Sequence, residues 1–243
     1  MTDIAARQWV ATIAAIRSFL REPTNALLLV LFPPVIIVVY DLALDAFVGV
    51  PGIDAPAAVG ELGGTMFAAA FLAGLVGVFQ VAGATGPDRR LEVCGYRRWE
   101  VLLARILTIV LVGVVVALIS FGTFLLLSDI EPASPGRAIA ALVVGAVTYG
   151  LLGVIIGGLI GRELEGSLVL VFLVDLDAFL ATGAIPVDTW IDDYLLLERP
   201  YTLFESAIFD GTLSTGDGIE AAVYAVVLLL LALAIIRLRG GSS

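Results

Sequence analysis

The sequence contains no lysine and no histidine, and its thirteen cationic side chains are all arginines. The missing lysine excludes ATP binding through a Walker A loop and Schiff-base chemistry on a lysine amine. The missing histidine excludes triads that contain it, HExxH zinc sites and histidine-ligated haem. The single cysteine, Cys94, excludes an internal disulfide and a thiolate cluster. We therefore expect no catalytic residues, no metal site and no resident cofactor.

Charged residues are also scarce. They make up 15% of the chain, against about 25% in soluble domains, while 60% of the residues are hydrophobic. This composition excludes a soluble globular domain and a disordered chain. It predicts an all-α integral membrane protein that contacts lipid, and we expect no nucleic-acid partner.

The net charge of −10, with arginine in place of lysine, indicates a halophilic archaeon as the source. A dense surface of carboxylates is screened in concentrated salt, where the Debye length falls to about 3 Å at 1 M. An ordinary GC-rich bacterium with a biased charge composition is the alternative.

Six segments are long and apolar enough to cross a bilayer core, which needs about 20 residues per helix. They are residues 26–44, 62–84, 101–127, 138–160, 167–183 and 219–236. Pro33 and Pro34 predict a kink in the first of them. Residues 1–243 are thus predicted to form a single transmembrane domain.

The arginines predict the orientation of this domain. Eleven of them precede the first predicted span or follow the second, fourth or sixth, and only Arg137 and Arg199 lie on the other side. The positive-inside rule then places both termini in the cytoplasm. We expect a multi-pass protein of the plasma membrane.

Two further segments are predicted to lie at the membrane surfaces. Residues 1–23 carry apolar side chains at helical spacing among arginines, which predicts an amphipathic helix in the cytoplasmic interface. A cytoplasmic extension of the first span is the alternative. Residues 184–218, on the outer side, are too apolar for a solvated loop and too interrupted to span. They predict short re-entrant or interfacial helices.

The cytoplasmic loop 85–100 is the most informative segment. Gly95 is suited to end a short helix made of the preceding residues, and the third span opens after it. A short charged helix held between two long helices is suited to transmit a push from a cytoplasmic partner. A simple topology anchor is the alternative.

The order of residues in this loop resembles the conserved cytoplasmic segment of the ABC-2 family of ATP-binding-cassette transporter permeases. The matching positions are Leu91-Glu92, the turn Gly95-Tyr96-Arg97-Arg98, then Trp99-Glu100-Val101-Leu102-Leu103 and Ala104-Arg105. A second match is Arg199-Pro200-Tyr201-Thr202-Leu203-Phe204, which resembles the Asn-Pro-Leu-Thr-Tyr run before the last span of such permeases. The loop is a few residues shorter than the common form, and Gly95 and Arg199 depart from the usual Pro and Asn.

The resemblance implies a permease that forms a homodimer or pairs with a related permease, and that exports a substrate with two separate ATPase subunits. ATP and Mg²⁺ would be bound by those subunits, and this chain would be no enzyme. The coupling helix that docks on the ATPase would be formed by Asp88, Arg89, Arg90, Leu91, Glu92, Gly95, Tyr96, Arg97, Arg98, Trp99 and Glu100.

A secondary transporter or channel that needs no ATPase is the alternative. It predicts inverted repeats and discontinuous helices, and the two halves of the sequence show no convincing repeat. An intramembrane aspartyl protease needs only two carboxylates. It is disfavoured because Asp175 and Asp177, two residues apart on a helix, point about 200° away from each other.

Asp175 and Asp177 are candidates for a translocation path. They are expected about 12–15 Å into the fifth span and near its middle, counted from Ser167 at about 1.5 Å per residue, where a charge costs at least ~2.5 kcal/mol. Either they line a path for a cationic or polar substrate or have a proton-linked role, or the fifth span is broken and both lie in a solvated outer vestibule.

Gly153, Gly157 and Gly161 form two overlapping GxxxG units in the fourth span. Small residues at this spacing let two helices approach closely. The close contact is predicted either within the chain or between two permease copies.

Overall fold

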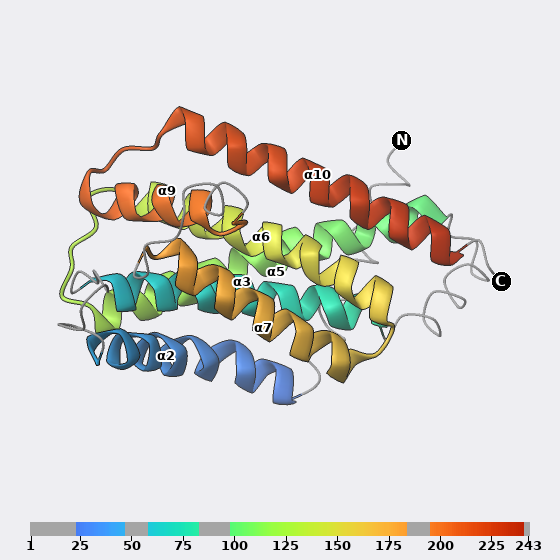
Figure 1. Cartoon of the computed structure of the whole chain (residues 1–243), viewed down its shortest axis with the longest axis horizontal. Coiled ribbons are helices and arrows are strands. Elements are labelled where there is room, and N and C mark those ends of the chain that lie inside the picture. The colour runs from blue at the N-terminus through green and yellow to red at the C-terminus, as the bar shows by residue number, and fades with distance from the viewer. Residues whose placement is uncertain (1–22, 47–57, 83–97, 184–194, 241–243) are drawn as a thin grey trace.

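The computed structural model describes residues 23–46, 58–82, 98–183 and 195–240, and its ordered elements in these ranges are seven helices (Figure 1). They are α2 (Pro23–Asp45), α3 (Val59–Ala82), α5 (Arg98–Leu127), α6 (Pro135–Ile160), α7 (Glu163–Ala181), α9 (Glu198–Phe209) and α10 (Thr215–Gly240). No strand occurs in the described ranges. The predicted all-α class is confirmed for them.

Five of these helices are long and apolar enough to cross a membrane, namely α2, α3, α5, α6 and α10. They indicate a multi-pass membrane protein. The fifth predicted span, residues 167–183, coincides with α7, which is 19 residues long but carries four carboxylates. The crossing by α7 therefore stays a prediction.

The six long helices alternate in direction along the chain (Figure 1). One end of the bundle, here called the α9 end, holds the last residue of α5, the first residue of α6 and helix α9. The opposite end holds Pro23, the first residue of α2, and the last residues of α10. The described chain thus enters and leaves the bundle at the same end.

Helix α3 is the centre of the bundle. It contacts α2, α5, α6, α7 and α9, and 94% of its apolar stretch is buried inside the protein. Glycine and alanine fill much of this helix, so its neighbours approach it closely. By contrast, the corresponding stretches of α2 and α10 are only 22% and 17% buried. Most of their apolar surface therefore faces outward, as expected for helices that contact lipid.

Helix α2 continues through Pro33 and Pro34. Proline removes a backbone donor from the helix, and inside a membrane such a site needs neighbouring helices. Pro33 is buried, and α2 packs against α3 and α5.

Several predicted segments fall outside the described residues. These are the proposed interfacial helix up to residue 22, most of the loop 85–100, and the first part of the segment 184–218. The remainder of that last segment contains α9, a short helix whose buried face consists of Pro200, Tyr201, Leu203, Phe204, Ala207 and Ile208.

Candidate functional site

The proposed coupling segment is only partly within the described residues. Residues 88–97 lie outside them, and Arg98, Trp99 and Glu100 are the first residues of α5. The last three residues of the segment therefore form the start of a 30-residue helix. Its role in docking an ATPase stays a prediction.

Asp177 lies on the buried face of α7 and is only 7% exposed. Its Oδ2 accepts a hydrogen bond from the Tyr149 hydroxyl of α6. The same oxygen accepts a hydrogen bond from the backbone N–H of Leu197, with 3.1 Å between N and O. Leu197 directly precedes α9. The carboxylate thus lies at a helix N-terminus, where unpaired N–H groups and the helix dipole favour an anion.

Asp175 contacts a different helix. Its Oδ1 accepts a hydrogen bond of 2.7 Å from the Tyr40 hydroxyl of α2, whereas Asp177 joins α7 to α6 and α9. The two carboxylates therefore act on separate neighbours, as their angular separation on a helix requires.

The position of these acids along α7 differs from the expectation. The helix is continuous from Glu163 to Ala181, so it is not broken at Asp175 or Asp177. Asp177 lies about 6 Å from the last residue of the helix, at about 1.5 Å per residue, and not near its middle. The expected depth was counted from Ser167, but α7 starts four residues earlier and ends two residues before the predicted boundary. Whether the acids line a path stays a prediction.

Arg199 links α9 to the first turns of α10. Its Nε lies 2.7 Å from Glu220 Oε2, and its guanidinium lies 3.4 Å from Asp217 Oδ1 and 3.6 Å from Glu198 Oε1. The sequence placed Arg199 on the outer side and in the second motif, but no ion pair was predicted for it. The usable signal was that it is the single cation among the acids of residues 184–218, so a pairing role was foreseeable.

The C-terminal end of α9 is held by the connection between α5 and α6. The backbone N–H groups of Ala133 and Ser134 donate to the carbonyl oxygens of Ile208 and Ala207 at 2.8 and 3.0 Å. These bonds satisfy carbonyl groups that a helix end leaves without an intrahelical partner. The Arg137 guanidinium donates to the Gly211 carbonyl oxygen just beyond. Helix α9 is thus attached at both of its ends.

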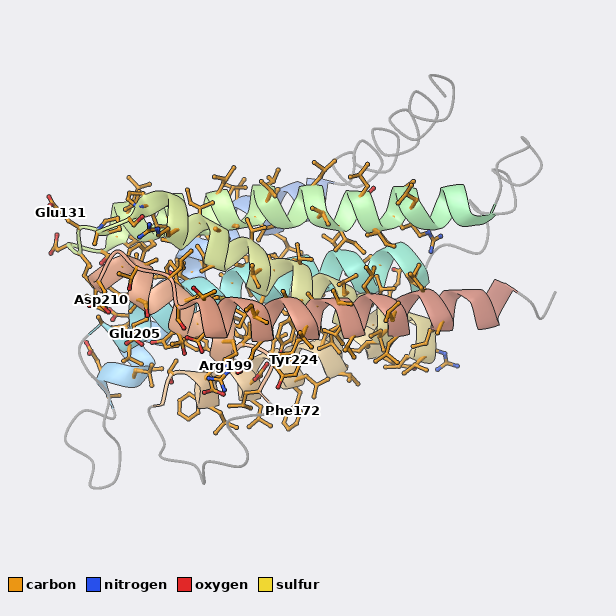
Figure 2. All side chains as sticks on the ribbon, turned by 90° about the horizontal axis from the view of Figure 1, so that it is seen from above. Glu131, Phe172, Arg199, Glu205, Asp210 and Tyr224 are labelled. Carbon is orange, nitrogen blue, oxygen red and sulfur yellow. The ribbon has the colours of Figure 1, made fainter. Side chains whose placement is uncertain are left out.

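Acidic side chains accumulate around α9. Figure 2 shows Glu131, Glu205 and Asp210 at the same end of the bundle as Arg199. Burial raises the pKa of the Glu205 carboxyl, and the nearby Asp210 raises it further. Burial likewise raises the pKa of the Tyr201 hydroxyl, with an added effect from Glu205. Tyr201 therefore stays neutral at physiological pH, and protonation of Glu205 is favoured more than that of a solvated glutamate.

The three glycines of the GxxxG units, Gly153, Gly157 and Gly161, do not share one role. A Cβ on Gly153 would overlap the carbonyl oxygen of Gly74 in α3, and one on Gly157 would lie 2.7 Å from the carbonyl oxygen of Val78. These two glycines therefore face α3 of the same chain. Gly161 has a left-handed backbone (φ 72°) and ends α6, and its N–H donates to the carbonyl oxygen of Gly157. Glycine adopts that conformation without steric cost.

The described residues contain no group of three or more histidine, cysteine, aspartate or glutamate side chains arranged to hold a metal ion. Asp175 and Asp177 instead accept hydrogen bonds from tyrosines and a backbone amide. Such contacts fix one helix against another. The arrangement at the α9 end is therefore suited to hold α7, α9 and α10 in place around the central helices.

Comparison with known proteins gives no further identification. No family model matches the sequence, and no curated protein matches it significantly.

Proposed function

We propose that the chain is the permease subunit of an ATP-driven exporter of the ABC-2 type in the plasma membrane. The observation that carries the proposal is the run of residues 91–105, whose order resembles the cytoplasmic segment of these permeases. The location of this run supports it. The run enters α5 at the end of the bundle that also holds Pro23 and the last residues of α10.

In the proposed orientation, α7 also crosses the membrane, as the fifth of six spans in chain order, and the end opposite α9 faces the cytoplasm. The arginines support this orientation through the positive-inside rule. Arg162 lies in the exposed turn between α6 and α7, at the end opposite α9. Arg137 and Arg199 lie at the α9 end. Both termini would then be cytoplasmic.

The proposed partners follow from what the chain lacks. Without lysine it has no Walker A loop, so ATP and Mg²⁺ would be bound by separate ATPase subunits. Those subunits would dock on the segment from Asp88 to Glu100. The permease would function as a homodimer or with a related permease.

An ATPase-independent secondary transporter receives less support. Such transporters often use discontinuous helices around a site at the middle of the membrane. The two places where the sequence suggested a break are Pro33-Pro34 and the acids of the fifth span. Helices α2 and α7 are continuous through both.

Co-purification tests the proposal. The neighbouring reading frames are searched for a GxxxxGK[ST] sequence, and the encoded protein is expressed with the tagged permease. We expect an ATPase to co-purify with the permease in detergent. A Lys-to-Ala change in the Walker A loop of that ATPase should abolish ATP hydrolysis without dissociating the complex. A permease that purifies alone, and whose transport in vesicles is insensitive to ATP, would contradict the proposal.

A further inference from the structure

The N-terminus of α9 is capped by a side chain from another helix. A helix is usually capped by the side chain of the residue just before its first turn, but that position is Leu197, which has no polar atom in its side chain. Asp177 of α7 accepts the hydrogen bond from the Leu197 N–H instead. The cap that α9 needs therefore also binds it to α7.

The groups around this contact are deeply buried. Leu197 is 0% exposed and Tyr149 is 1% exposed. If Asp177 lost its carboxylate, the Leu197 N–H and the Tyr149 O–H would be left as buried donors without their acceptor. Unsatisfied buried donors destabilise the packed arrangement, whereas water satisfies them once the segment opens. Loss of the carboxylate would therefore raise the free energy of the arrangement in which α9 is packed against α6 and α7.

The other attachments of α9 are independent of Asp177. Its C-terminal end is bound to Ala133 and Ser134, and Arg199 binds it to Asp217 and Glu220 of α10. Loss of Asp177 would therefore leave α9 tied to α10 and to the connection between α5 and α6. The hydrogen bonds that are lost are those that link α9 to α6 and α7, so only apolar contacts, such as those of Leu197 and Pro200 near Gly145, remain there.

We propose that Asp177 is the positioning residue that locks the N-terminal half of α9 against α6 and α7. Without its carboxylate, that half moves away from α6 and α7 while Arg199 keeps it tied to α10, and its buried face becomes accessible to water. This lock is a property of the fold of this chain, and it goes beyond the proposed export function because it requires neither an ATPase nor a substrate.

Cysteine accessibility tests the lock in the full-length protein. The native Cys94 is replaced by serine, and Leu203→Cys places a reporter thiol on the buried face of α9, where Leu203 is 4% exposed. Labelling by a membrane-impermeant maleimide is then measured with and without Asp177→Ala. We expect Asp177→Ala to raise the labelling rate about tenfold or more, as expected for the loss of a charge-assisted hydrogen bond.

Two controls distinguish a local opening of α9 from a general destabilisation of the protein. Asp175→Ala removes a carboxylate two residues away that binds α2 instead, and it should leave the Leu203→Cys rate unchanged. A second reporter, Val59→Cys, lies in the corner where Leu44, Val59 and Phe179 pack together. Its rate should not respond to Asp177→Ala. An unchanged labelling rate of Leu203→Cys would overturn the proposal. So would an equal rise in labelling rate at the two reporters, or an equal rise caused by Asp175→Ala and Asp177→Ala.

A milder variant covers the case in which Asp177→Ala does not accumulate. Asp177→Asn keeps an acceptor oxygen but loses the charge, so we expect a several-fold rise at Leu203→Cys relative to Asp175→Asn. Equal rates for these two amide variants would overturn the proposal. Because the measurement involves no transport, its outcome is independent of the proposed exporter function.

Discussion

At the scale of single residues, glycine determines how closely the central helices approach. A Cβ on Gly77 of α3 would overlap the carbonyl oxygen of Gly150, and one on Gly153 of α6 would overlap that of Gly74. The backbones of α3 and α6 are therefore in direct contact at these positions. The repeated glycine spacing predicted a close contact, but the sequence left open whether its partner lay in the same chain.

Gly153→Ala should destabilise the protein by about 2 kcal/mol, because the added methyl forces the backbones of α3 and α6 apart. The control is Gly122→Ala in α5, where an added Cβ meets nothing within 4 Å. It should be neutral or stabilise the helix by up to about 1 kcal/mol, the cost of glycine in a helix interior. Thermal unfolding of both variants in detergent measures the difference. Equal midpoints would contradict the described packing.

At the scale of helices, the sequence predicted the long elements well. The predicted spans begin and end within a few residues of α2, α3, α5, α6, α7 and α10, because long apolar runs bounded by glycine, proline and charge leave little choice in a membrane. The bounds of α9 could not be predicted in this way. Its N-terminal cap comes from Asp177, 20 residues earlier in the chain, and its C-terminal partners come from residues 133–134.

The attachment of α10 depends on Arg199. Arg199→Gln should destabilise the protein by about 1–2 kcal/mol, because three carboxylates would lose their shared cation. Concentrated salt should restore part of the stability by screening the carboxylates that remain.

Arg162→Gln is the control, since the Arg162–Glu165 pair is largely exposed, at 74% and 51%, and exposed pairs contribute little. Thermal unfolding at low and high salt distinguishes the two. A similar response of both variants would contradict the role given to Arg199.

At the scale of the whole molecule, the alternating helices separate the chain into two surfaces with different charge. Among the described residues, the α9 end holds Arg137 and Arg199 together with acids such as Glu131, Glu205 and Asp210, whereas the remaining described arginines belong to the start of α5, the turn after α6 and the last turns of α10, toward the opposite end. The proposed orientation follows from this separation.

Two exposed positions test that orientation in cells. With Cys94 replaced by serine, Glu131→Cys lies at the α9 end and Leu164→Cys lies in the first turn of α7, where Leu164 is 74% exposed. An impermeant maleimide should label Glu131→Cys in intact cells, and should label Leu164→Cys only after the membrane is opened. The reverse pattern would place the α9 end in the cytoplasm.

The central claim is that a separate ATPase docks on the segment from Asp88 to Glu100. The most direct test measures ATP hydrolysis by the reconstituted complex after charge reversal at Glu92 or Arg97, with Arg162→Glu, in the turn between α6 and α7, as the control. We expect both reversals in the segment to abolish the effect of the permease on hydrolysis while membrane insertion stays intact, and the control to preserve it. Unchanged coupling in both reversed variants would contradict the claim.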